Sequence, residues 1–128
     1  MKCAWTNFLS VVPLSIRQDV DKRGREHLQE LRLRIGQPVE LIMHKERSFL
    51  SHNATTEDLQ FVINTASRYS PWASTSSAKG YITASGGHRI GVCGECVIQN
   101  GKVTGFRYAT SLCMRVARSF EGIAYMHR

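Results

Sequence analysis

Two stretches in which apolar and polar residues alternate constrain the fold of this chain most strongly. The first covers residues 28–44 and contains a turn at 36–38, and the second lies within residues 81–118. A period of two places successive side chains on opposite faces of a β-strand, so both stretches predict strands with one buried face. Asn100-Gly101 divides the second stretch and favours a type I′ hairpin turn, because both central positions of that turn need positive φ.

The remaining segments carry patterns that are typical of helices. Apolar residues spaced i, i+3, i+4 and i+7 predict a short helix over residues 5–12, and residues 16–25 predict a second, more polar one. Thr55 can cap a third helix, because Asp58 lies three residues further on and completes a capping box. Residues 71–79 predict a fourth helix, which begins with a proline and is followed by a glycine.

This order of elements predicts one α+β domain, with a mostly antiparallel sheet and helices packed on one side of it. Its parts are a helical lead-in, a hairpin with a short third strand, a helical segment and a β-meander, over residues 1–27, 28–51, 55–79 and 81–118. The chain has 128 residues, 42% of them hydrophobic and 21% charged, which is enough to build a core of its own.

The chain is basic, with a formal net charge of +7 and an isoelectric point of about 9.6. This charge favours an anionic partner, or an acidic neighbouring domain or subunit. No apolar run reaches the ~18 residues of a spanning helix. Residues 4–16 are interrupted by polar residues and a proline, so no signal peptide is predicted. The four cysteines (Cys3, Cys93, Cys96, Cys113) are therefore expected to be reduced thiols in a cytoplasmic protein.

No catalytic motif stands out. Gly86 and Gly91 have the separation of a phosphate loop, but Val92-Cys93 follows where Lys-Ser/Thr is required, so we expect no nucleotide hydrolysis by this chain alone. Cys93 and Cys96 form a C-x-x-C pair, yet residues three apart in an alternating strand point to opposite faces. Because no second pair follows to complete four ligands, no metal site is assigned. A metal or redox role of this pair remains a separate hypothesis.

Arginine placement is the most informative chemical feature. Six arginines on predicted strands are candidates for contacts to a phosphate or carboxylate partner. They are Arg32, Arg34, Arg89, Arg107, Arg115 and Arg118. The first two share the outer face of one strand and are candidates for an interface. Arginine's planar fork suits phosphates and carboxylates, and Gly86-Gly87 can bring backbone N–H groups close to an anion.

A nucleic-acid-binding α+β module is the alternative interpretation of the same charges. Tyr81, Phe106 and Tyr108 offer aromatic faces for base stacking beside the arginines. The chain has neither the flanked GxxG loop of KH domains nor an RNP1 pattern. A salt-dependent binding titration would separate this alternative from a protein-assembly domain.

Three spaced motifs stand out when the chain is taken as a whole. They are QELRLRIGQPVEL at residues 29–41, GYIT with GGHRIGVCG within residues 80–94, and GKV with SLCMRVAR at residues 101–103 and 111–118. These segments resemble EEIRLRxGxPLEL, GFIT with GGHRVGLxG, and GKV with SLNIRIAR of the stage III sporulation protein AA family. The motifs keep the family's order over residues 14–118, which makes the resemblance specific.

The resemblance implies a role in endospore formation. That family joins such an N-terminal domain to a C-terminal ATPase domain similar to the hexameric motors of type II and type IV secretion. It acts in the mother cell, at the forespore membrane, with membrane proteins of a connecting channel. The present chain ends where the ATPase domain would begin, so ATP and Mg²⁺ are implied for the full-length family and not for this chain. A cytoplasmic, non-catalytic regulatory or assembly domain is therefore implied.

The resemblance also implies a fold similar to the N-terminal domains of secretion ATPases, which pack over the nucleotide that the motor domain holds. By this likeness, Arg89 and Arg115 are expected to approach the phosphates or a neighbouring subunit. Arg107 and Arg118 are the next candidates. A hexameric full-length protein is implied in the same way.

Overall fold

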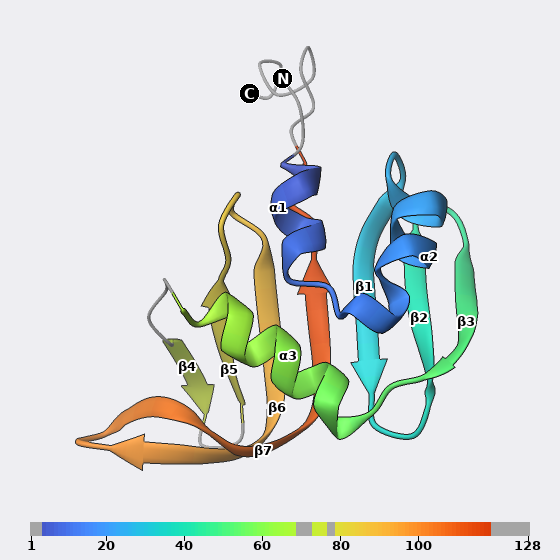
Figure 1. Cartoon of the computed structure of the whole chain (residues 1–128). Coiled ribbons are helices and arrows are strands. Elements are labelled where there is room, and N and C mark those ends of the chain that lie inside the picture. Colours follow the sequence, from blue (N-terminus) through green and yellow to red (C-terminus); the bar gives the residue numbers. More distant parts are fainter. Residues whose placement is uncertain (1–3, 69–72, 77–78, 119–128) are drawn as a thin grey trace.

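The structure is a computed structural model that describes residues 4–68, 73–76 and 79–118. Figure 1 shows the helices and strands within these ranges. They are α1 (Trp5–Ser10), α2 (Leu14–Gly24), β1 (Leu28–Arg34), β2 (Pro38–Met43), β3 (Arg47–Asn53), α3 (Thr56–Ala66), β4 (Ala73–Ser76), β5 (Lys79–Thr83), β6 (Arg89–Gln99) and β7 (Lys102–Arg115).

The strands form one antiparallel, seven-stranded sheet in the order β3-β2-β1-β7-β6-β5-β4. The hairpins of β1 to β3 and the meander of β4 to β7 therefore meet where β1 pairs with β7. In Figure 1 the three described helices all lie on one side of this sheet. The predicted α+β class, with an antiparallel sheet and helices on one side, is confirmed in the described part of the chain.

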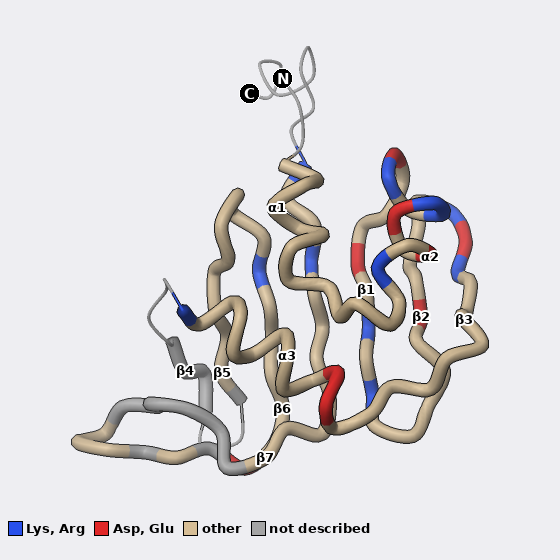
Figure 2. Tube along the Cα trace, in the orientation of Figure 1, with Lys and Arg blue, Asp and Glu red and all other residues tan. Residues whose placement is uncertain are grey.

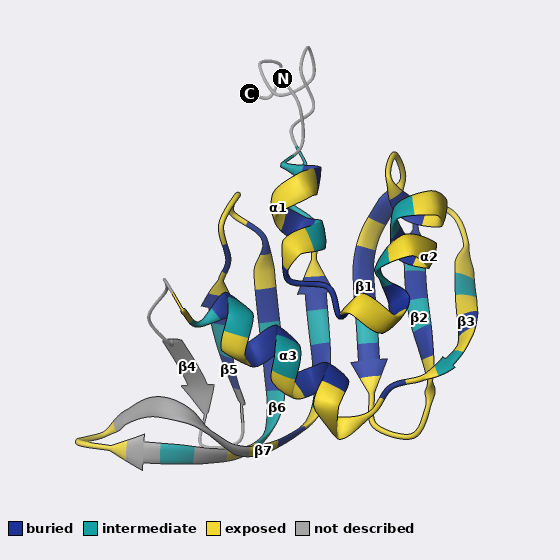
Figure 3. Ribbon diagram, in the orientation of Figure 1, coloured by how far each residue is buried: buried dark blue, intermediate teal, exposed yellow. Residues whose placement is uncertain are grey.

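Alternation along the strands separates a buried face from a more exposed one (Figure 3). On β1, Leu31 and Leu33 are fully buried in one cluster with Phe8 of α1. Their neighbours point the other way, so that Arg32 is half-buried and Arg34 is exposed. We call the side under the helices the covered face. Each fully buried aliphatic side chain there stabilises the fold by about 1.5–3 kcal/mol.

The predicted capping box at the start of α3 is confirmed. Thr55 Oγ1 accepts a hydrogen bond from the Asp58 backbone N–H at 3.1 Å, and Asp58 Oδ2 accepts one from the Thr55 N–H at 3.0 Å. The same carboxylate accepts from Ser15 Oγ at 2.9 Å and from His52 Nε2 at 2.7 Å, which connects α3 to α2 and β3. Burial alone would raise the pKa of Asp58, but these hydrogen bonds outweigh it and hold the pKa below its usual value.

The predicted fourth helix is wrong. Residues 73–76 form the edge strand β4 and not the middle of a helix over residues 71–79, and Lys79–Thr83 forms β5, which pairs with β4. Serine and threonine are frequent in this segment and are poor helix formers, because their side chains compete for backbone hydrogen bonds. Pairing with β5 gives those backbone groups partners instead. Pro71, the expected first residue of the helix, lies outside the described residues.

The predicted Asn100-Gly101 turn between β6 and β7 is confirmed, since both residues have positive φ, 54° and 76°. The register of this hairpin shifts at three places. A Cβ at Gly94 would collide with the backbone carbonyl O of Tyr108, so only glycine allows the two strands to approach as they do there. Figure 1 shows the outer part of the hairpin bending away from the sheet, as bulges commonly cause.

The start of α1 and the end of β7 meet at His88, which is fully buried. Its Nδ1 accepts a hydrogen bond from the Ala117 N–H at 3.0 Å, and its Nε2 lies 2.8 Å from the Ala4 carbonyl O. Since Nδ1 accepts and a carbonyl cannot donate, the ring is the neutral tautomer with its proton on Nε2. Burial lowers the pKa of His88, which favours this neutral form. We call Ala4, Gly86, His88, Ala117 and Arg118 the junction.

Candidate functional site

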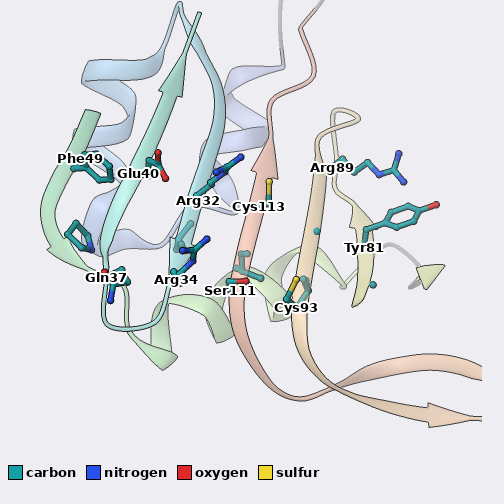
Figure 4. A pocket seen from close by; sticks show the side chains of 16 residues that line it. Arg32, Arg34, Gln37, Glu40, Phe49, Tyr81, Arg89, Cys93, Ser111 and Cys113 are labelled. Atoms are coloured by element: carbon teal, nitrogen blue, oxygen red, sulfur yellow. The ribbon is translucent and has the colours of Figure 1, made fainter. Parts of the chain in front are cut away.

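The side of the sheet that the helices leave uncovered carries an open cavity of about 490 Å³. Its lining comes from β3, β2, β1, β7, β6 and β5. Figure 4 shows Arg32 and Arg34 of β1 toward its middle, Phe49 at one side, and Tyr81 with Arg89 at the other. We call this surface the open face.

Strand register arranges the open face in rows that cross the sheet. The first row, from β3 to β5, is Arg47, Ile42, Glu30, Arg115, Arg89 and Thr83. The middle row is Phe49, Glu40, Arg32, Cys113, Gly91 and Tyr81. The third row contains Arg34, Ser111 and Cys93. Directly opposed residues of antiparallel strands point to the same side of a sheet, so each row presents its side chains together.

The small side chains of the middle row explain why the open face is hollowed into a cavity. Gly91 has no side chain, and its row neighbours are the small thiol of Cys113 and the ring of Tyr81. Phe49, at the other end of the row, is 56% exposed. Five inter-strand steps separate β3 from β5, a width of roughly 24 Å at about 4.8 Å a step. The cavity is thus a trough with an aromatic residue at each side and a glycine in its floor.

Glu30 organises the centre of the first row. Its carboxylate accepts hydrogen bonds from Arg32 Nε at 2.6 Å and from Cys113 Sγ at 2.7 Å, and it lies 3.7 Å from Arg115 Nε. Burial alone would raise the pKa of Glu30, but these donors outweigh it and lower the pKa, so the group is ionised at neutral pH. Burial, and then the hydrogen bond to this carboxylate, raise the pKa of the Cys113 thiol to about 11. Cys113 is therefore a thiol and not a reactive thiolate at neutral pH.

Arg34 and Arg89 have no carboxylate partner among the described residues. The carboxylates of the open face pair with other arginines, as Glu40 does with Arg47 at 3.3 Å. The Arg89 guanidinium carbon lies 3.8 Å from the centroid of the Tyr81 ring, a cation–π stack that leaves the N–H edges of the fork accessible. Figure 2 shows basic positions on β1, β6 and β7 in the middle of the sheet. The two exposed guanidinium groups of Arg34 and Arg89 can thus donate hydrogen bonds to an anionic group of another molecule.

The structure brings four of the six predicted arginines together. Arg32, Arg34, Arg89 and Arg115 share the open face. Arg107 lies on β7, and its side chain falls outside what the structure describes. That any of these residues contacts a phosphate or a subunit stays a prediction.

Arg118 lies at the junction and not on the open face. It donates hydrogen bonds to the carbonyl O atoms of Leu28 at 2.8 Å, Gly24 at 3.0 Å and Arg25 at 3.2 Å. Its guanidinium also lies 5.4 Å from the centroid of the Trp5 ring. The guanidinium group of Arg118 is thus engaged within the fold. It connects the segment after β7 to the region between α2 and β1.

The Gly86-Gly87 turn also belongs to the junction. Both glycines have positive φ, 91° and 84°, which side chains rarely adopt. A Cβ at Gly86 would come within 2.7 Å of the Ala4 Cβ and 3.1 Å of the Asn7 Cβ. The glycine at this position therefore allows α1 to pack against the turn, a role that the sequence pattern did not suggest.

The described cysteines of the open face are Cys93 and Cys113, while the side chain of Cys96 lies outside the described part. Cys93 and Cys113 are diagonal neighbours on β6 and β7, since their opposed residues are Ser111 and Gly91. Diagonal positions are about 7–8 Å apart, beyond the reach of a disulfide. Across residues 4–68, 73–76 and 79–118 no group of three or more His, Cys, Asp or Glu could hold a metal ion.

Sequence reasoning missed Glu30, Gly91 and His88. Glu30 was one of several polar positions on an alternating strand, and its partner Cys113 is 83 residues away. Gly91 and His88 belong to the motif GGHRIGVCG, but the motif alone indicates neither the floor of a trough nor a buried histidine. The one signal at hand was that two of the three fall within the motif GGHRIG, where arginine follows a glycine turn.

Comparison with known proteins shows the family to which this chain belongs. The profile of the family described as "Sporulation stage III, protein AA" matches residues 6–126. This chain belongs to that family. A curated family member, Stage III sporulation protein AA of Bacillus subtilis (strain 168), is 40% identical over 118 residues, which cover 89% of this chain and 38% of that protein. The chain thus spans well under half the length of this curated relative.

No solved structure matches this stage III sporulation protein AA family chain. Its expected similarity in fold to the N-terminal domains of secretion ATPases therefore stays a prediction. Of the helices that the structure describes, none has both the length and the apolar character needed to cross a membrane.

Proposed function

We propose that this chain is the N-terminal, non-catalytic assembly domain of a sporulation-associated, secretion-type ATPase, and that it offers its open face to the motor domain or to a neighbouring subunit. Family membership supports the link to sporulation. The observation that carries the rest is the gathering of Arg32, Arg34, Arg89 and Arg115 on one uncovered face of the sheet. Two of them lack a carboxylate partner among the described residues.

In this proposal the motor domain holds ATP and Mg²⁺. The residues of this chain do not fit such a site, because no Lys-Ser/Thr follows its glycines. The open-face carboxylates, Glu30 and Glu40, are engaged by arginines and are poor candidates for Mg²⁺. What the chain can add is guanidinium groups. An arginine supplied to a transferring phosphoryl group can raise the rate by ~10³–10⁵, whereas an exposed ion pair contributes only about 0–1 kcal/mol.

The full-length protein would then work in the mother-cell cytoplasm at the forespore membrane, as a hexamer in contact with membrane proteins of the channel. The support for this part is the family resemblance. The basic character of the chain, with its net charge of +7, is consistent with an acidic neighbour in such an assembly.

A chimeric protein tests the proposal. Residues 6–118 of this chain replace the matching segment of the Bacillus subtilis relative, and both spore formation and ATP hydrolysis by the purified chimera are measured. We expect Arg89→Ala and Arg115→Ala to lower turnover at least tenfold, because each removes a guanidinium from the proposed contact. Arg23→Ala is the matched control, since Arg23 is exposed on α2, away from the open face.

Equal turnover in the Arg89, Arg115 and Arg23 variants would contradict the proposal. Hydrolysis of ATP by this chain without a motor domain would contradict it as well, since the chain would then hold a nucleotide site of its own. Spore formation by the unchanged chimera shows that the replaced segment performs the same task as the relative's own.

A nucleic-acid-binding module is the second candidate function. The observation that favours it is the stack of Arg89 on Tyr81, because both a guanidinium plane and an aromatic ring can stack with bases. Its signature is an affinity for oligonucleotides that falls steeply as salt rises.

A further inference from the structure

The open face has the composition of a surface that another molecule covers. The half-buried thiols of Cys93 and Cys113 lie in it, and cysteine is among the residues least often left facing solvent. Phe49, 56% exposed, lies at its side. A solvated strand face would carry polar side chains at these positions. We therefore expect a molecule that binds in the trough to present an apolar surface to it.

The charges of the open face indicate which kind of molecule can bind there. Five arginines accompany two glutamates in its rows. These are Arg32, Arg34, Arg47, Arg89, Arg115, Glu30 and Glu40. The excess of positive charge disfavours a second copy of the same face, because like charges would meet. A continuous polyanion would also come close to Glu30 and Glu40, which would repel it. A protein segment, in contrast, can place acidic side chains opposite Arg34 and Arg89 alone.

The trough is wide enough to hold a helix together with the side chains that flank it. It is roughly 24 Å wide between Phe49 and Tyr81 at about 4.8 Å per strand step, and a helix with its side chains is about 10–12 Å across. From Glu30 to Arg34 along β1 the rows extend about 14 Å at ~3.4 Å per residue, the length of about nine helical residues. Arg34 and Arg89 lie in the third and first rows, hence at opposite ends of this length.

We propose that the open face binds an acidic amphipathic helix of another polypeptide chain, laid along the strands between Phe49 and Tyr81. The apolar stripe of the helix covers Gly91 and its row neighbours, and carboxylates near its two ends pair with Arg34 and Arg89. Guanidinium groups pair with carboxylates through two parallel hydrogen bonds, which gives the contact its orientation. The inference rests on the proposed function, since it names what the same surface recognises.

A synthetic helical peptide of 15 residues serves as the probe, with leucines in one stripe and glutamates beside it. Its binding to this chain is measured by fluorescence anisotropy near physiological salt. We expect saturable binding, about tenfold weaker for the same peptide with glutamine in place of glutamate. Arg34→Ala and Arg89→Ala should each weaken binding about tenfold, and Arg23→Ala should leave it unchanged. Bound peptide should also slow alkylation of Cys93, which lies in the third row.

Arg34→Lys and Arg89→Lys guard against effects on folding, because they keep the charge and lose the fork; we expect them to bind more weakly than the unchanged chain. No saturable binding, or binding that the arginine variants leave unchanged, overturns the proposal. A single-stranded oligonucleotide that binds more tightly than the peptide overturns it too, in favour of the nucleic-acid module. The chimera remains a separate test: lost turnover in its Arg89→Ala form without peptide binding would reject the acidic helix and retain the assembly domain.

Discussion

The two faces of the sheet are made by the same strands but use their side chains differently. On the covered face, positions such as Leu31, Leu33 and Ile90 are apolar and fully buried, and the helices pack on them. On the open face the β1 neighbours of these leucines, Arg32 and Arg34, line a trough that nothing in the described chain covers. Fold stability should therefore depend on one face, and recognition of a partner on the other.

Two neighbouring substitutions on β1 give the most direct test of this difference between the two faces. Leu33→Ala leaves a cavity in the covered face and should lower the free energy of unfolding by about 2–5 kcal/mol. Arg34→Ala removes an exposed side chain and should change it by no more than about 0.5 kcal/mol. Urea unfolding followed by circular dichroism measures both.

A large loss of stability in Arg34→Ala would mean that the open face holds the fold together and is not reserved for a partner. Conversely, a Leu33→Ala variant as stable as the unchanged chain would show that the helices do not depend on the covered face. The two residues are adjacent on one strand, so the pair serves as its own control.

The second prediction extends the comparison to arginines. Arg118 donates to three backbone carbonyls at the junction, whereas Arg115 is 72% exposed and lies 3.7 Å from Glu30. Arg118→Ala should lower the free energy of unfolding by about 1–3 kcal/mol, because it leaves carbonyl groups without donors. Arg115→Ala should cost about 0–1 kcal/mol, as for an exposed ion pair. Thermal unfolding of the two variants side by side provides the measurement.

Arg118→Lys sharpens the result. It keeps the charge but loses the planar fork that reaches several carbonyls at once, so it should recover only part of the lost stability. Equal stability of the Ala variants at positions 115 and 118 would mean that Arg118 is not a structural residue, and it would then return to the candidates for contact with a partner.

Features that depend on neighbours in the sequence could be predicted. The capping box of Thr55 and Asp58 needs residues three apart, and the Asn100-Gly101 turn needs two adjacent residues with positive φ. The alternation that predicted β1 also predicted which of its faces is buried. In each case the chemistry and the geometry lie within one turn or one strand.

Features that depend on which strands meet could not be predicted. Residues 73–76 become a strand because β5 is beside them, a fact that local propensity does not contain. The open face exists because β1 pairs with β7, which brings Glu30 to Cys113 across 83 residues. Arg118 and Arg115 look alike in the sequence, and only the path of the chain after β7 separates a structural arginine from an exposed one.

The smallest expected effect concerns Glu30, which is mostly buried although it lies on the open face of the sheet. Its pKa in the folded chain is lowered from 4.5, so its contribution to stability is fully present above that value and is lost as pH falls through the folded pKa. Glu30→Gln should therefore cost about 1 kcal/mol at pH 7, and the difference from the unchanged chain should shrink below about pH 4.5.

The same substitution should change Cys113, whose pKa of about 11 is raised first by burial and then by Glu30. In Glu30→Gln the carboxylate is gone but burial remains, so the pKa should fall while staying above the ordinary value of 9.0. Site-resolved alkylation between pH 8 and 10, read by mass spectrometry, should show faster reaction at Cys113 and no change at Cys93. An unchanged rate at Cys113, together with a stability difference that persists at low pH, would mean that Glu30 is held by packing and not by its charge.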